Sequence, residues 1–264
     1  QTLPRGRLQG FCVPEFRPVL DAFQANFSQR DELGASVSLT VNGKTVVDLW
    51  GGLAEAESGK PWQKDNVSIV FSCTKGATAI CAHVLKSRGL LDYDAPVTRY
   101  WPEFGKHGKE ATTVRMFLDH SAGLPALRAP VKKDGAYDWT YMTDRLADEA
   151  PFWTPGTRNG YHGLTFGWTV GEIVRRVSGK SLGRFFQDEI AKPLGIDFWI
   201  GLPEEHEPRV APMVRHVWPS DMALPPFLEA VVKDKNSTPS LFLLNTGGFM
   251  PGGANTRAGH AAEI

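Results

Sequence analysis

The chain has 264 residues, of which 42% are apolar and 22% charged, a composition typical of a globular protein with a sizeable core. Lysine plus arginine and aspartate plus glutamate number 29 each, so no net field draws the chain to nucleic acid or to an anionic membrane. There is no apolar run of about 20 residues and no signal-peptide pattern, so we expect a cytoplasmic protein without a membrane span. Cys12, Cys73 and Cys81 lack a metal-binding spacing and are predicted to be small buried side chains in a reducing compartment.

An amphipathic helix and a β-hairpin are predicted first. Apolar residues recur at helical spacing from about residue 14 to residue 30. Residues 35–41 then alternate with period two, Asn42-Gly43 is a favoured two-residue turn, and residues 45–50 form the returning strand. Gly51-Gly52 is the predicted end of the hairpin.

Helices dominate the prediction for the middle of the chain. One helix is expected to begin near Ser72, after an apolar run, and to end before Gly89. Further helical segments are predicted at residues 97–104, 113–120, 142–150, 165–177 and 181–192, the last with Ser181 as N-cap. Residues 198–200 are predicted to be a strand that re-enters the sheet, and the chain from Pro203 on to be irregular.

Ser72 and Lys75 form an S-x-x-K box at the predicted start of the helix. Residues three apart lie on one face of a helix, so the Lys75 amine is expected to reach the Ser72 hydroxyl and activate it as a nucleophile. No other serine of the chain has a lysine three residues later. The box alone fits a catalytic pair and a chance match about equally well.

Tyr161 is a second polar candidate, in the glycine-rich loop 155–163 directly before a predicted helix. A phenol near a lysine charge can act as general acid or base. Taken alone, a loop tyrosine is more commonly a hydrogen-bonded packing group.

The combination of these residues resembles a known group of proteins. The Ser72 box, Pro155-Gly156-Thr157 and Tyr161 are similar to motifs of the class C β-lactamases, penicillin-binding proteins and family VIII carboxylesterases. Segments 100–104, 113–124 and 193–195 also resemble that group. The stretch from Tyr161 to Trp168 is most similar to the esterase branch.

The resemblance implies an α/β fold of the β-lactamase/transpeptidase type, in which helices flank an antiparallel sheet and a helical lobe is inserted. Residues 1–75 and 191–264 would form the α/β lobe, and residues 76–190 the mainly helical lobe, within a single domain.

The resemblance further implies a serine hydrolase that cleaves carboxylic esters. Ser72 would be acylated by the substrate, Lys75 and Tyr161 would share its proton, and the Ser72 N–H would be one donor of the oxyanion hole. His162 and Gly163 would line the substrate site. No cofactor or metal is expected, because the histidines show no metal-ligand spacing.

Two departures from the family pattern keep other interpretations open. The family's Tyr-x-Asn box reads Tyr161-His162-Gly163 here, which favours esters over β-lactams. The family's third box and its closing strands are not found before Ile264, so the chain is expected to be a fragment or to be completed by a second polypeptide. A β-lactamase or D-amino-acid peptidase is the alternative enzyme, and a catalytically silent binding protein the alternative of another class.

Two further segments imitate catalytic motifs. Ser121 lies in a sequence that lacks the first glycine of a nucleophile elbow and follows a predicted helix instead of a strand, so it is not expected to be the nucleophile. Asn245-Thr246-Gly247 resembles the third box, but glycine-rich residues follow it and no strand pattern surrounds it.

Overall fold

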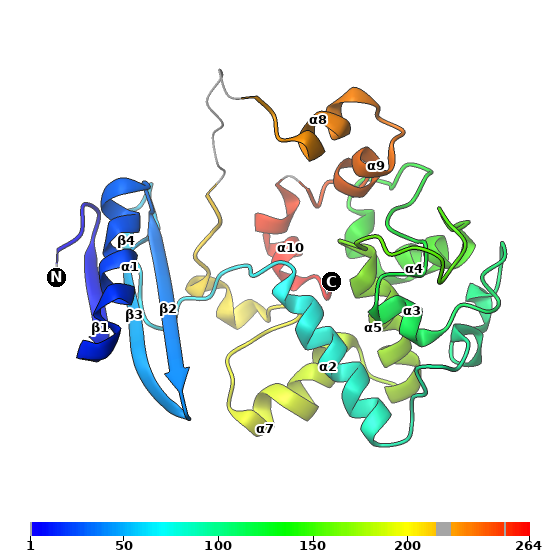
Figure 1. The fold of residues 1–264 in the computed structure, drawn as a ribbon, viewed down its shortest axis with the longest axis horizontal. Coiled ribbons are helices and arrows are strands. Elements are labelled where there is room, and N and C mark those ends of the chain that lie inside the picture. The colour runs from blue at the N-terminus through cyan, green and yellow to red at the C-terminus, as the bar shows by residue number, and fades with distance from the viewer. Residues whose placement is uncertain (1, 215–222, 251) are drawn as a thin grey trace. The chain divides into compact units, whose positions relative to one another are not determined.

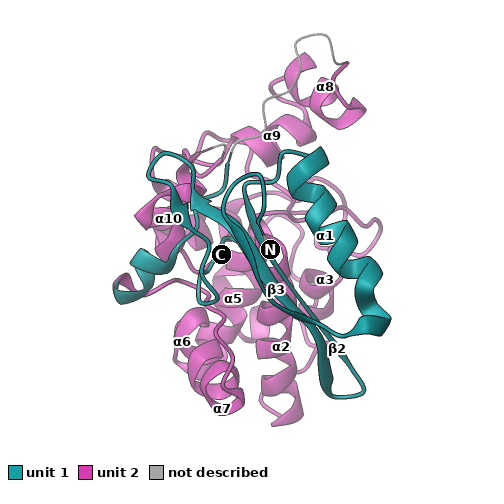
Figure 2. Ribbon diagram, turned by 90° about the vertical axis from the view of Figure 1, so that its left-hand side faces the viewer, with its two compact units in different colours: residues 1–69, 205–216 teal, residues 70–204, 217–264 magenta. Residues whose placement is uncertain are grey.

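The computed structural model describes residues 2–214, 223–250 and 252–264. The chain divides into two compact units, coloured separately in Figure 2. Unit 1 comprises residues 1–69 and 205–216, and unit 2 comprises residues 70–204 and 217–264. These bounds differ from those of the predicted lobes, and the division of a whole domain into those lobes stays a prediction.

Unit 1 is built on the predicted hairpin, in which β2 (Gly34–Val41) and β3 (Lys44–Glu55) pair antiparallel. Two strands that were not predicted join β3: β1 (Arg7–Cys12) and the short β4 (Lys60–Pro61). The main strand order is β1-β3-β2.

The predicted amphipathic helix is α1 (Arg17–Gln29), which covers this sheet (Figure 1). It buries Phe23 and Phe27 against Val47 and Leu49 of β3, and these residues form the core of the unit. Burying one such side chain contributes about 1.5–3 kcal/mol, and the shared apolar face is what holds helix and sheet together.

The predicted end of the hairpin at Gly51-Gly52 is wrong, because β3 continues through both glycines to Glu55. A Cβ at Gly51 would lie 2.6 Å from the carbonyl oxygen of Arg7, and one at Gly52 would lie 2.2 Å from that of Leu33. The two glycines therefore allow neighbouring backbone to approach β3 closely, which is a common role of glycine within strands.

Unit 2 is helical and centres on two helices that pack against each other, α2 (Cys73–Ser87) and α5 (Thr165–Ser178). Both were predicted. The other α-helices described in this unit are α3 (Val114–Leu118), α4 (Trp139–Asp148), α6 (Leu182–Phe186), α7 (Lys192–Leu194), α8 (Pro226–Lys233), α9 (Thr238–Leu244) and α10 (Arg257–Ala261). Figure 1 shows α8, α9 and α10 in the part of the chain predicted to be irregular.

Three local predictions in unit 2 have clear outcomes. Ser181 is the N-cap of α6, as predicted, and its hydroxyl accepts the N–H of Arg184 at 3.3 Å. Residues 198–200 do not form a strand: Phe198 packs edge-on against Phe186, and its carbonyl accepts the side-chain amide of Gln187 at 2.7 Å. The prediction that all three cysteines are buried is wrong for two of them: Cys73 at the start of α2 is exposed and Cys12 is half-buried, whereas burial of Cys81 raises the pKa of its thiol to about 12.

A buried carboxylate ties α4 to α5. Glu172 is 1% exposed and accepts hydrogen bonds from Trp139 Nε1 at 2.7 Å, from Arg175 and from Arg176. These donors hold its pKa below the usual value although burial alone acts in the opposite direction. The Trp139 hydrogen bond therefore joins the start of α4 to the second half of α5.

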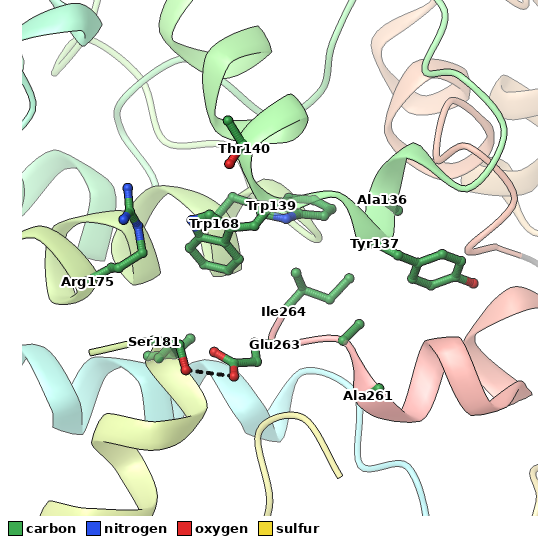
Figure 3. Close-up of a pocket in the computed structure, with 12 residues that line it drawn as sticks. Ala136, Tyr137, Trp139, Thr140, Trp168, Arg175, Ser181, Ala261, Glu263 and Ile264 are labelled. Carbon is green, nitrogen blue, oxygen red and sulfur yellow. Dashed lines mark hydrogen bonds between the residues drawn. The ribbon is translucent and has the colours of Figure 1, made fainter. Parts of the chain in front are cut away.

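Unit 2 also contains a cavity of about 400 Å³ between α4, α5, α6 and the segment after α10 (Figure 3). Glu263 lies in it and accepts the Ser181 hydroxyl at 2.8 Å. Its lining shares no residue with the Ser72 box or the Tyr161 loop. Within the part of the chain that is described, no helix combines the length and the apolar run that a membrane crossing requires.

Candidate active site

Ser72 and Lys75 meet at the N-terminal end of α2. Ser72 is the N-cap residue, and Lys75 follows one turn later on the same face of the helix. The Lys75 Nζ atom donates to the Ser72 Oγ atom at 3.2 Å. Ser72 is exposed and Lys75 half-buried, so the hydroxyl is accessible while the amine is partly shielded from solvent.

The residue before Ser72 has an unusual backbone conformation. Phe71 has a φ of 42°, which bulky side chains rarely adopt. Its carbonyl still accepts the N–H of Thr74 at 3.0 Å, so the first turn of the helix is closed around it. Backbone strain of this kind persists only where the surrounding structure maintains it, and it is concentrated at functional sites.

Tyr161 reaches the same hydroxyl from the loop before α5. Its hydroxyl donates to the Ser72 Oγ atom at 2.5 Å. The side chain is 48% exposed, and its ring lies 6.2 Å from that of Phe242 in α9. The three residues predicted to be catalytic are therefore brought together around one oxygen atom.

Lys75 is fixed by further contacts within the same site. Its Nζ atom donates to the carbonyl of Gly163 at 2.5 Å and lies 4.9 Å from the centre of the Tyr161 ring. Gly163 itself is packed against Phe242, since a Cβ at this position would lie 2.2 Å from two ring atoms. Gly163 thus contacts Lys75 through its backbone, and its role in substrate binding stays a prediction.

His162 is 2% exposed and has hydrogen bonds at both ring nitrogens. Its Nε2 atom accepts the N–H of Leu124 at 2.8 Å, so the ring proton is on Nδ1, which contacts the Gly160 carbonyl at 2.6 Å. Burial lowers its pKa to about 4. These contacts favour a role in holding the loop, while the predicted part in substrate binding stays a prediction.

His120 belongs to the same cluster but was not singled out from the sequence. Its ring centre lies 5.1 Å from that of Tyr161 and 5.0 Å from that of Phe166. Burial, and then the positive charge of Lys75, lower its pKa. Its place in a segment that resembles the family was the one signal that pointed to it.

The two segments that imitate catalytic motifs lie in other surroundings. The Ser121 hydroxyl donates to the Asp119 carboxylate at 2.6 Å and lies in the turn after α3. Asn245 ends α9, and its side chain bonds the backbone of residues 127–131. Among the residues described, no group of three or more metal-ligating side chains could hold a metal ion.

Residues 20–258 match the Beta-lactamase family. The chain belongs to this family. Its fold is of the β-lactamase/transpeptidase type, as predicted, with an antiparallel sheet and many helices. In solved structures, the chain is similar to a family VIII carboxylesterase, with 46% identity and a TM-score of 0.75 over 79% of this chain and 57% of that one. It is also similar to EstA from Arthrobacter nitroguajacolicus Rue61a, with 32% identity and a TM-score of 0.81 over 97% of this chain and 65% of that one.

Among curated members of the family, the chain is 40% identical to "Esterase/beta-lactamase LipL" of Mycobacterium tuberculosis, over 82% of this chain and 50% of that protein. It therefore spans about half the length of this relative. None of the findings supports a second polypeptide that carries the remaining part of the fold.

Proposed function

We propose that the protein is a serine hydrolase that cleaves carboxylic esters through an acyl-enzyme on Ser72. The observation that carries the proposal is the convergence of two proton-transfer groups on one hydroxyl: Lys75 Nζ at 3.2 Å and the Tyr161 hydroxyl at 2.5 Å from Ser72 Oγ. A serine becomes a nucleophile when an adjacent base can take its proton, and both distances are within reach for that transfer.

The first half of the reaction forms the acyl-enzyme. Ser72 Oγ attacks the ester carbonyl carbon as its proton passes to a deprotonated Tyr161 or Lys75. The same pair then returns the proton to the alcohol oxygen, which leaves as the carbon–oxygen bond breaks. In the second half, a water gives its proton to the pair and attacks the acyl carbon, and Ser72 Oγ recovers a proton as the acid departs.

The Ser72 N–H supports the developing oxyanion in this proposal. The hydrogen bonds of the turn begin with Cys73 N–H to the Val70 carbonyl at 3.1 Å, and in the described ranges no backbone or side-chain acceptor takes the Ser72 N–H. One oxyanion donor in a serine hydrolase contributes about 3 kcal/mol or more to transition-state stabilisation.

An ester is the proposed substrate, in preference to a β-lactam, because of the residue at position 163. The family's asparagine side chain is replaced by Gly163, whose backbone carbonyl contacts Lys75. The surroundings of the site are apolar, with Phe71 44% exposed and the Phe242 ring beside that of Tyr161, which suits short or medium acyl groups. The esterase names of similar proteins agree with this choice.

Hydrolysis of p-nitrophenyl butyrate and of nitrocefin by the purified protein tests the proposal. We expect turnover of the ester and little or none of the β-lactam. Faster hydrolysis of nitrocefin would favour the β-lactamase alternative. No turnover of either substrate by a folded sample would favour the catalytically silent alternative.

A further inference from the structure

The turn after α3 holds the Tyr161 loop through three consecutive backbone carbonyls. The Asp119 carbonyl accepts the side-chain amide of Asn159. The next carbonyl, that of His120, accepts the N–H of Gly160 at 3.0 Å. The third, that of Ser121, accepts the N–H of Gly156 at 3.0 Å. The position of the loop therefore depends on a segment about 40 residues earlier in the sequence.

His120 makes a second contact with this loop through its side chain. Its Nδ1 atom accepts the N–H of His162 at 3.1 Å. The two amides on either side of Tyr161 thus both donate to His120, one to the carbonyl and one to the ring. The His120 ring also lies against the Tyr161 ring, at 5.1 Å between centres.

We propose that His120 is the positioning residue of Tyr161: it brackets the tyrosine between two hydrogen bonds and thereby sets the distance from the phenol oxygen to Ser72 Oγ. The inference rests on the proposed function, in which that distance governs proton transfer. Misplacement of a catalytic group by about 1 Å can reduce a rate on the order of 10²-fold.

This role requires that His120 Nδ1 carry no proton, because only an unprotonated nitrogen can accept the His162 N–H. The groups that face the ring are the Lys75 ammonium, the Asp119 carboxylate, the Tyr161 phenol and the His162 ring. Burial and Lys75 lower the pKa of His120, and Asp119 opposes them. The neutral ring is therefore retained at neutral pH. Protonation at lower pH turns the Nδ1 atom into a second donor, so the hydrogen bond from the His162 N–H is lost.

The backbone of His120 offers a way to test the ring separately from the fold. Its φ is 64°, a conformation that asparagine and glycine tolerate well. In His120→Asn the amide oxygen is a short, non-titrating acceptor, whereas His120→Gly keeps the backbone conformation and removes the acceptor. His107 has a φ of 56° and is exposed, so His107→Asn and His107→Gly are matched controls.

The experiment measures kcat for p-nitrophenyl butyrate and the rate of fluorophosphonate labelling at Ser72, from pH 5 to 8. We expect His120→Gly to lower both rates at least about tenfold at pH 7 to 8 with KM little changed, and His120→Asn to recover most of the loss. The ratio of wild-type rate to His120→Asn rate should fall as the pH drops below 6.5, the ordinary histidine pKa. The His107 variants should keep a ratio independent of pH.

Equal rates in His120→Gly and the wild type would overturn the inference and leave the proposed function standing. So would a His120→Asn variant as slow as His120→Gly in a folded state, because the lost acceptor would then not explain the defect. A wild-type protein that does not label at Ser72 would overturn both.

Discussion

Ser72 and Lys75 are joined by a single turn of α2, whereas Tyr161 reaches the same oxygen from a loop that three distant carbonyls and two histidine rings hold in place. The first pair depends on helix geometry, which a short sequence determines. The second contact depends on tertiary packing, which can fail without loss of either residue. The two sides of the site should therefore respond differently to mutation and to pH.

The largest expected loss of activity follows from a mutation at the start of α2. Ser72→Ala removes the nucleophile, so hydrolysis of p-nitrophenyl butyrate should fall at least about 10³-fold. Ser121→Ala removes a hydroxyl that is bonded to Asp119, and it should keep most of the activity. The reverse result would show that Ser121, and not Ser72, is the nucleophile.

Tyr161→Phe removes the phenol oxygen and keeps the ring against His120. Because general acid–base groups typically contribute about 10²–10⁴-fold, kcat should fall by that factor with little change in KM. Tyr100→Phe, which removes a hydroxyl bonded to the Asp92 N–H, is the matched control and should leave kcat within about threefold. A Tyr161→Phe enzyme with near wild-type kcat would assign proton transfer to Lys75 alone.

The buried His162, in the Tyr161 loop, should make the free energy of unfolding depend on pH. Its pKa is about 4 in the folded protein and near 6.5 when unfolded, so the folded state excludes the proton. Stability is fully present above pH 6.5 and is lost as the pH falls toward 4, by about 3 kcal/mol since one pKa unit corresponds to about 1.4 kcal/mol. Urea unfolding of wild type and His162→Gln measures it. An equal slope in both proteins over this range would contradict the assignment.

Gly163→Ala should have the smallest effect, because the clash falls on the far end of the Phe242 ring. Overpacking of this kind costs about 1–3 kcal/mol of unfolding free energy, and Phe242→Ala in the same protein should relieve part of it. Gly76→Ala, on α2 with open space around it, is the control and should not destabilise. Strict additivity of Gly163→Ala and Phe242→Ala would show that the two positions do not interact.

The features that could be predicted from the sequence were local. The Asn42-Gly43 turn fixes the hairpin, and the spacing of Ser72 and Lys75 fixes their contact. The pairing of β1 with β3 could not be predicted, because it joins segments far apart in the chain and leaves no periodic pattern of its own. The short helices α8 to α10 were missed for a related reason, since helices of one or two turns carry little periodicity.

The same division explains what was missed in the site. Tyr161 was found through a resemblance, and nothing in its spacing places it near Ser72. The hydrogen bonds that hold its loop, from Leu124 to His162 and from His162 to His120, join residues about 40 positions apart. The positive φ of Phe71 was also invisible, because a phenylalanine gives no sign of that conformation.

The most direct test of the central claim is the site of covalent labelling by a fluorophosphonate, mapped by peptide mass spectrometry on the intact, folded protein. A single adduct at Ser72, absent from Ser72→Ala and slowed by Tyr161→Phe, is the predicted result. An adduct at Ser121 instead, or no adduct at any serine, would contradict the account.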